Sequence, residues 1–176
     1  LLNSWEGVHF DTTPESLQGM VTDFAKLGGE MFVVDDGWFG PKYPRNNDKT
    51  SLGDWGIAKS KLPNGIRPLI YLTHKNGMKF GIWIEPEMAN IKSELFEKHP
   101  DWILRHPDFE PTYGRGKTQM LLDLTNPQVQ EHVFSIVDNL LTEYPDIYYI
   151  KWDNNMSMHN AQSQYLPKAL QSNLAV

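Results

Sequence analysis

The sequence predicts an α/β fold built from parallel βαβ units, and three observations predict this class. Short apolar runs at residues 31–34, 80–84, 120–124 and 147–153 have the length and composition of buried strands. Amphipathic stretches with helical spacing separate these runs, as expected for crossovers between parallel strands. Acidic residues follow several of the runs, at positions that share one edge of a parallel sheet.

The first cycle opens with residues 1–6, which we interpret as the end of an earlier strand. A helix is expected over residues 13–28, because threonines precede it, Pro14 suits its first turn and Gly28 ends it. Its apolar residues recur with a period close to that of an α-helix. The strand at 31–34 follows directly, so this cycle has the order helix and then strand.

Two further cycles repeat this order. A helix around residues 66–72 precedes the strand at 80–84. A longer helix begins at Pro127 and ends before Pro145, and it precedes the strand at 147–153. We therefore expect several parallel strands with right-handed helical crossovers.

The acids past the strand ends narrow the fold to a barrel. They are Glu6, Asp35, Asp36, Glu85, Glu87 and Asp153. Their convergence on one mouth is typical of a (β/α)8 TIM barrel, whereas an open sheet would show a Gly-rich phosphate turn that is absent here. A full barrel takes about 250 residues. We therefore expect a partial barrel, about the first four strands, over residues 1–160, and a tail of loop or weak helix at 161–176.

Composition argues against several classes of partner. The net charge is −6 and the 16 Lys and Arg form no run, so nucleic acid is not expected. No stretch approaches the roughly 20 apolar residues of a membrane span and residues 1–10 lack a signal-peptide pattern, so a soluble, cytoplasmic protein without membrane contact is expected. Cysteine is absent, which excludes disulfides. No two histidines show helical spacing, which argues against zinc and predicts solvated or core side chains for His9, His74, His99, His106, His132 and His159.

Asp153 is the best candidate for a catalytic carboxylate. Lys151 lies two residues earlier on the same strand, so both side chains point to one side and the ammonium can keep the carboxylate ionised. An ionised, oriented carboxylate is what attack on an anomeric carbon requires. A structural ion pair at a strand end explains the same spacing equally well.

The pair Asp35 and Asp36 has two chemical interpretations. Adjacent carboxylates can bind a hard cation such as Mg²⁺, or they can accept hydrogen bonds from vicinal sugar hydroxyls. A capped turn before Gly37 is a third, structural explanation. Trp55 lies in a loop rich in Gly, Asn and Asp, where either stacking on a sugar or anchoring of the loop accounts for it. Trp83 lies between two isoleucines and is expected in the core or the barrel wall.

Five runs occur in a fixed order over residues 3–155: Asn3-Ser4-Trp5-Glu6, Phe32-Val33-Val34-Asp35-Asp36-Gly37-Trp38-Phe39-Gly40, Gly53-Asp54-Trp55, Gly81-Ile82-Trp83-Ile84-Glu85-Pro86-Glu87-Met88 and Tyr149-Ile150-Lys151-Trp152-Asp153-Asn154-Asn155. Together they resemble the catalytic barrel of family 36 glycoside hydrolases, the bacterial α-galactosidases. The resemblance implies a retaining mechanism without metal or cofactor. It also implies a substrate with terminal α-linked galactose, as in raffinose- or melibiose-like sugars.

The resemblance also implies roles for individual residues. Asp153 matches the nucleophile, and the sugar-binding positions are matched by Asp35, Asp36, Trp55, Lys151 and Asn155. A family arginine has Lys117 at its position here, with Arg115 two residues earlier, so either side chain is a candidate for that contact. The family's acid/base aspartate follows the sixth strand, which this chain is not expected to reach.

These observations predict an α-galactosidase-type chain, expected to be truncated, with a nucleophile but no identifiable acid/base. Two alternatives stay open: a non-catalytic sugar-binding half-barrel and a metal-dependent hydrolase that uses Asp35, Asp36 and Asp153 as ligands. Half a barrel leaves two unpaired strand edges, so self-pairing into a homo-oligomer, or aggregation, is expected.

Overall fold

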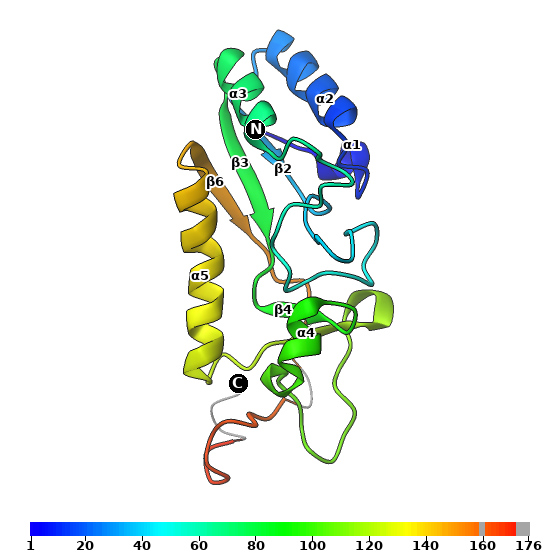
Figure 1. The fold of residues 1–176 in the computed structure, drawn as a ribbon, viewed down its shortest axis with the longest axis vertical. Coiled ribbons are helices and arrows are strands. Elements are labelled where there is room, and N and C mark those ends of the chain that lie inside the picture. Colours follow the sequence, from blue (N-terminus) through cyan, green and yellow to red (C-terminus); the bar gives the residue numbers. More distant parts are fainter. Residues whose placement is uncertain (159–160, 172–176) are drawn as a thin grey trace.

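The computed structural model describes residues 1–158 and 161–171, and helices and strands are mixed along the chain (Figure 1). The segments in chain order are β1 (Leu2–Asn3), α1 (Trp5–Val8), α2 (Pro14–Lys26), β2 (Met31–Val34), α3 (Arg67–Lys75), β3 (Lys79–Ile84), β4 (Met88–Asn90), α4 (Glu94–Lys98), η1 (Pro100–Trp102), η2 (Arg115–Lys117), β5 (Gln119–Leu121), α5 (Pro127–Glu143) and β6 (Ile147–Trp152).

Four strands form one parallel sheet in the order β1-β2-β3-β6. Val34 pairs with Ile82 across β2 and β3, and Ile84 pairs with Trp152 across β3 and β6. The carboxyl ends of these strands therefore lie at one edge of the sheet. The predicted α/β class with a parallel sheet is confirmed.

The predicted strand at residues 120–124 does not belong to this sheet. Its first two residues belong to β5, which pairs antiparallel with β4 in a separate two-stranded sheet. In this pair Met88 lies opposite Leu121. Met120 and Leu122 are buried in a second apolar cluster with Trp102 and Ile103. The apolar run indicated burial correctly, but the cluster that buries it lies away from the parallel sheet. The parallel strand next to β3 is instead β6.

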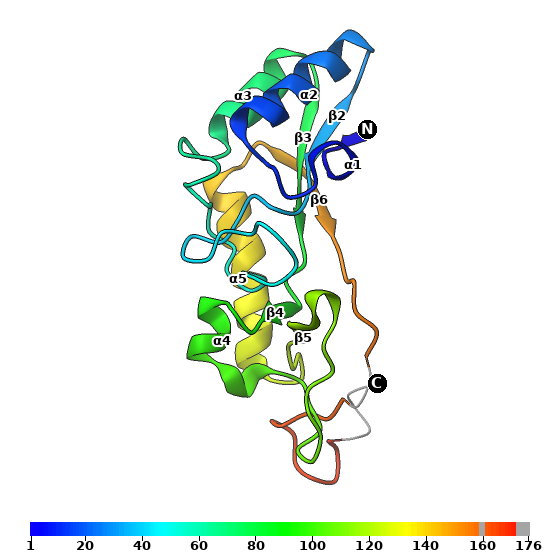
Figure 2. The ribbon, with the colours of Figure 1, turned by 90° about the vertical axis from the view of Figure 1, so that its right-hand side faces the viewer.

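The predicted helices α2 and α5 begin within one residue of their expected starts, and their caps explain why, whereas the short helices α1 and α4 were not predicted. Thr13 caps α2 in a reciprocal capping box with Ser16, and Pro14 occupies the first helical position. Asn126 caps α5 by accepting a hydrogen bond from the backbone N–H of Gln128. Figure 2 shows α2, α3 and α5 on one side of the four-stranded sheet.

The main core lies between these helices and the sheet. It contains fully buried side chains from the strands and from the helix faces, among them Leu17, Val21, Phe32, Phe80 and Ile82. In the described part of the chain, no helix has the length and apolar character needed to cross a membrane. The burial of the strands fixes the positions of the residues that follow their carboxyl ends.

Part of the tail expected at residues 161–176 is described, and residues 161–171 form turns. Ser163 Oγ donates to Oδ2 of the buried Asp123 at 2.7 Å, and the backbone N–H of Gln164 donates to the same oxygen at 3.1 Å. These contacts attach the segment beside the start of α5. Residues 172–176 lie outside the described range, so the prediction of loop or weak helix stays untested there.

Candidate active site

A polar hollow of about 310 Å³ lies where the parallel strands end. Residues after β2, β3 and β6 line it together with side chains from strands, short helices and loops nearby: Trp5, Asp35, Asp36, Arg45, Asp48, Trp83, Glu85, Arg115, Gln119, Lys151, Asp153 and Asn155. Five of the six predicted site residues line this hollow, and Trp55 is the exception. The convergence follows from the parallel register, because residues just past paired positions must lie side by side.

Asp153 is held by the strand next to it. Its backbone N–H donates to the carbonyl of Ile84 at 2.9 Å, which extends the pairing of β6 with β3 by one residue. Trp83 lies opposite Lys151 in this register, so its indole is on the side of the sheet that Lys151 and Asp153 share. From there, Nε1 of Trp83 donates to Oδ2 of Asp153 at 2.9 Å.

The environment of Asp153 favours its ionised form. Partial burial raises the pKa of this carboxyl, but hydrogen bonds from Trp83 and Asn155 and the charge of Lys151 oppose burial and leave the pKa below its ordinary value. Nδ2 of Asn155 donates to Oδ2 at 2.9 Å, and Nζ of Lys151 lies 3.9 Å from the same oxygen. The lysine therefore contributes as predicted, alongside two neutral donors that spacing did not reveal.

Lys151 makes its shorter contact with Asp35. Its Nζ donates to Oδ2 of Asp35 at 2.8 Å, and Nδ2 of Asn3 donates to the same oxygen at 2.6 Å. The Asp35 side chain is 4% exposed, and its backbone N–H donates to Oγ of Ser4. Lys151 thus links two carboxylates across the hollow, one after β2 and one after β6.

Asp36 pairs with an arginine that the sequence analysis missed. Nε and Nη2 of Arg45 donate to Oδ1 and Oδ2 of Asp36 at 2.9 and 2.8 Å, and both side chains are buried. Burial raises the pKa of Asp36, while the hydrogen bonds and charge of Arg45 oppose that rise. The turn after Asp36 needs Gly37, whose φ is +114° and whose Cα faces the backbone of Phe10 so closely that an added Cβ would lie 3.0 Å from it.

Glu85 lines the hollow, as expected for an acid at a strand end, but sequence reasoning gave it no individual role. It is 1% exposed, and its Oε1 accepts hydrogen bonds from the backbone N–H and from Nδ2 of Asn155, the latter at 3.0 Å. Burial raises the pKa of Glu85 to about 7; the donors of Asn155 oppose this, and the charges of Asp153 and Asp36 add to it. Its position after β3 was visible in the sequence as one of the acids at strand ends.

Two other predicted acids do not enter the hollow. Glu6 lies in α1 with an exposed side chain, because the chain turns into a helix directly after β1 and presents Trp5 to the hollow instead. Glu87 accepts a hydrogen bond from Nε1 of Trp152 at 2.8 Å and does not line the hollow. The expectation that all acids at the strand ends converge on one mouth is therefore wrong for Glu6 and Glu87.

The structure distinguishes between the two basic candidates near residue 116. Arg115 lines the hollow, and its Nη2 donates to Oδ1 of Asn155 at 3.1 Å. Lys117 has a positive φ of 57° at the end of η2 and does not line the hollow. Of the two candidates for the family's arginine contact, Arg115 is therefore the one whose side chain reaches the hollow.

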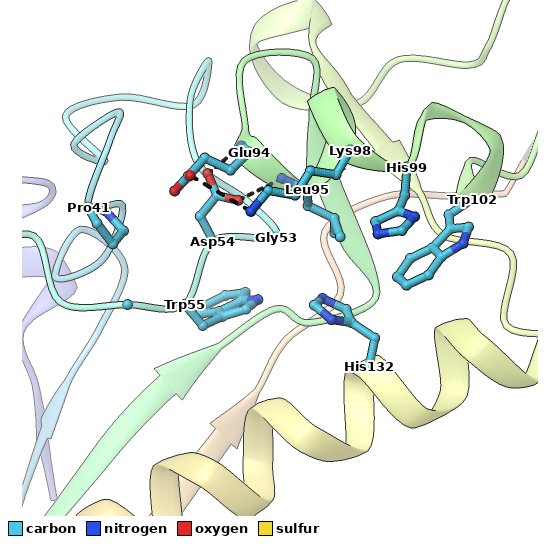
Figure 3. Close-up of a pocket in the computed structure, with 11 residues that line it drawn as sticks. Pro41, Gly53, Asp54, Trp55, Glu94, Leu95, Lys98, His99, Trp102 and His132 are labelled. Carbon is cyan, nitrogen blue, oxygen red and sulfur yellow. Dashed lines mark hydrogen bonds and ion pairs between the residues drawn. The ribbon is translucent and has the colours of Figure 1, made fainter.

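Trp55 lies in a different hollow, of about 340 Å³, beside His99, Trp102 and His132 (Figure 3). It is partly buried, and its ring centroid lies 4.4 Å from that of Phe39. Packing against Phe39 fits the anchoring of the loop, one of the two explanations given for Trp55, and its stacking on a sugar stays a prediction. Trp83, expected as core or barrel wall, is the tryptophan that reaches the carboxylate hollow from a strand.

The histidines and carboxylates form no metal cluster in the described part of the chain: no three of these side chains gather in a geometry that could hold an ion. Asp35 and Asp36 each face a cation of the protein, Lys151 and Arg45. His132 is partly buried, and burial, with a smaller contribution from His99, lowers its pKa. The prediction for His159 lies outside the described residues.

Comparisons with known proteins identify relatives over the whole chain. The family model described as Melibiase matches residues 1–176. Alpha-galactosidase C of Emericella nidulans is 44% identical over 171 residues, which is 93% of this chain and 22% of that protein. Alpha-galactosidase AgaA of Geobacillus stearothermophilus is 40% identical over 175 residues, 99% of this chain and 23% of that protein. The chain therefore spans between a fifth and a quarter of the length of these relatives.

Solved structures show the same likeness. The crystal structure of an α-galactosidase from Lactobacillus brevis matches with a TM-score of 0.89 and 40% identity, over 97% of this chain and 22% of that one. A variant of the Geobacillus stearothermophilus GH36 enzyme AgaA in complex with raffinose matches with a TM-score of 0.87 and 40% identity, over 96% of this chain and 23% of that one.

Proposed function

The chain belongs to the Melibiase family, and on that premise we propose that its polar hollow is the galactose-binding part of an α-galactosidase active site. The observation that carries the proposal is the state of Asp153. It lies at the carboxyl edge of a parallel sheet, is held ionised by Trp83, Asn155 and Lys151, and is 30% exposed toward the hollow. These are the properties that a glycosidase nucleophile needs.

In the proposed reaction, an oxygen of Asp153 attacks the anomeric carbon of a terminal α-linked galactose. A C–O bond forms to the enzyme as the glycosidic C–O bond breaks, and its electron pair leaves with the departing oxygen, which takes a proton from a general acid. Water then hydrolyses the ester and the configuration is retained. We propose that the acid lies outside the described residues, since no position that matches the family motif supplies it.

The other predicted residues have roles that fit their contacts. Asp35 and Asp36 are acceptors held rigid by Lys151 and Arg45, so they are suited to hydrogen bonds from vicinal hydroxyls of the sugar. Nζ of Lys151, 2.8 Å from Asp35 and 3.9 Å from Asp153, is suited to a hydroxyl between them. The raffinose and stachyose complexes of AgaA variants support an oligosaccharide with terminal galactose as the substrate.

We also propose that the four parallel strands are part of a (β/α)8 barrel, with residues 1–160 forming this part. The parallel order, the helices on one side of the sheet and the convergence of polar residues at the carboxyl edge support that architecture. Both outer strands, β1 and β6, have one edge without a strand partner among the described residues. Further strands of a barrel would pair there.

Calorimetry tests the sugar proposal directly. The chain is titrated with galactose in buffer and again with EDTA, and binding that is unchanged by the chelator is expected. Asp35→Ala should weaken binding about tenfold or more, because a buried acceptor for the sugar is removed. Asp23→Ala is the matched control, since this aspartate lies on the exposed surface of α2. The absence of galactose binding would refute the proposal, and loss on chelation would favour a metal site.

Covalent chemistry is tested with α-galactosyl fluoride, which needs no general acid because fluoride is a good leaving group. Attack by Asp153 forms the C–O bond and breaks the C–F bond, so fluoride is released and a galactosyl ester remains or is hydrolysed. Fluoride release, or a galactosyl adduct located on Asp153 by mass spectrometry, is expected. Asp153→Asn should abolish both signals while galactose binding persists, and a reactive Asp153→Asn chain would refute the assignment of the nucleophile.

A further inference from the structure

Glu85 is a buried carboxyl for which the proposed mechanism has no use. It is the residue after Ile84, and Asp153 is the residue after Trp152, the partner of Ile84 in the neighbouring strand. The two acids therefore occupy corresponding places past the ends of β3 and β6, on the side of the sheet that faces the hollow. They are adjacent without being joined by a direct hydrogen bond, and the group between them is Asn155.

The amide of Asn155 connects the two carboxyls with both of its N–H groups. Nδ2 lies 3.0 Å from Oε1 of Glu85 and 2.9 Å from Oδ2 of Asp153. Arg115 donates to Oδ1 of the same amide at 3.1 Å, and because a guanidinium only donates, this contact fixes which end of the amide is oxygen. The amide can therefore adopt one orientation only, with its nitrogen toward both acids.

Glu85 also holds the main chain of Asn155. Its Oε1 accepts the backbone N–H of that residue in addition to the side-chain N–H, so one buried oxygen fixes both parts of the asparagine. This segment follows β6 and has no strand partner beyond Asp153 in the described structure. The contact with Glu85 therefore fixes the main chain beyond β6, where the described residues form no hydrogen bonds to a neighbouring strand. Asn155, the residue held in this way, donates to Asp153.

Building on the proposed function, we propose that Glu85 is a positioning residue, which acts through Asn155 to orient the nucleophilic carboxylate of Asp153. Removal of Glu85 frees Asn155 from two of its hydrogen bonds and leaves Asp153 without a fixed donor on that side. Misplacement of a reacting group by about 1 Å can cost two orders of magnitude in rate.

Glu85 differs from the other carboxyls of the hollow in its lack of a cation. Asp35 has Lys151 and Asp36 has Arg45, whereas Glu85 makes no salt bridge with a described residue. The charged groups that share the hollow with it are Asp35, Asp36, Arg45, Asp48, Arg115, Lys151 and Asp153. Its pKa of about 7 means that its charge changes near neutral pH.

Formation of the galactosyl ester determines whether the reaction rate rises or falls when Glu85 loses its proton. Attack by Asp153 removes a negative charge beside Glu85 and develops positive charge on the sugar ring. Both changes favour the deprotonated form of Glu85. The rate of glycosylation by α-galactosyl fluoride is therefore expected to rise severalfold as the pH passes 7.

The test compares Glu85→Gln, Glu85→Ala and the control Glu87→Gln by the rate of fluoride release or adduct formation between pH 5 and pH 9. Gln keeps the acceptor oxygen, so at pH 6 this variant should react within about threefold of the unsubstituted chain, without the rise near pH 7. Ala should react about 10- to 100-fold more slowly at every pH. Glu87→Gln, which changes a charge outside the hollow, should keep both rate and profile.

Circular dichroism and galactose calorimetry accompany each variant, so a fold defect is recognised. If Glu85→Ala does not fold, Glu85→Gln alone decides: persistence of the rise near pH 7 in that variant overturns the inference. Glu85→Ala reacting at the unsubstituted rate overturns it as well. A complete loss of reaction in Glu85→Gln with binding intact also contradicts a positioning role, because Gln keeps the acceptor oxygen for Asn155. An unreactive unsubstituted chain instead refutes the proposed nucleophile.

Discussion

The burial of Glu85 without a cation should make the stability of the chain depend on pH. The ordinary pKa of a glutamate is 4.5, and burial raises that of Glu85 to about 7 in the folded chain. A difference of this size corresponds to about 3 kcal/mol of unfolding free energy. Because the folded pKa is the higher one, this stability is fully present below pH 4.5 and is lost as the pH rises through 7.

The substitution Glu85→Gln removes this titration and keeps the acceptor oxygen for Asn155. Urea unfolding, followed by tryptophan fluorescence, is measured for the variant and the unsubstituted chain at pH 5 and pH 8. The unfolding free energy of the variant minus that of the unsubstituted chain should increase by about 2 to 3 kcal/mol from pH 5 to pH 8. All other groups titrate in both proteins, so their contributions cancel in this difference.

Glu87→Gln serves as the matched control because it makes the same chemical change two residues away. Its stability relative to the unsubstituted chain should differ by less than about 0.5 kcal/mol between the two pH values. A Glu85→Gln difference that is equal at pH 5 and pH 8, or that falls with pH, would show that Glu85 is ionised in the folded chain throughout this range. The reasoning from burial would then be refuted.

Three further predictions concern the neighbours of the carboxylates and the sheet edges. Arg45→Met should lower the unfolding free energy by about 3 to 5 kcal/mol in urea titrations, since it leaves Asp36 buried without its cation; a loss below about 1 kcal/mol would contradict this. Trp83→Phe should raise the pKa of Asp153, measured by carboxyl NMR, because the Nε1 donor is lost, whereas Trp55→Phe should leave it unchanged. The open edges of β1 and β6 should cause self-association in sedimentation velocity, and a concentration-independent monomer would refute this.

Local sequence patterns predicted those helices and strands whose bounds are set by residues within them or next to them. The strand at residues 31–34 has the predicted bounds, because a continuous apolar run is interrupted by Asp35. The start of α5 follows from the pair Asn126 and Pro127. Five of the residues that line the hollow were predicted, because strand ends converge in a parallel sheet and because the motifs around them resemble a known family.

The remaining features depend on tertiary contacts that no local pattern encodes. Arg45 lies in a long loop without periodicity, and its role becomes visible only when its partner Asp36 is known to be buried. The pairing of β4 with β5 could not be predicted, because an apolar run shows that a segment is buried and not which segment covers it. Trp83 lines the carboxylate hollow and Trp55 does not. This placement depends on the register of β3 against β6, which puts Trp83 opposite Lys151.

Four of the five carboxyls that line the hollow acquire different properties from their partners. Asp35 and Asp36 have cations at 2.8 Å and side-chain exposures of 4% and 8%, so their carboxyls are held in place in the wall. Glu85 is as deeply buried but lacks a cation, so it takes up a proton near neutral pH. Asp153 is stabilised as an anion mainly by neutral donors and is 30% exposed, so it combines a negative charge with access to a ligand. Trp83 and Asn155 both donate to Oδ2 of this carboxylate, so the loss of either donor should raise the pKa of Asp153.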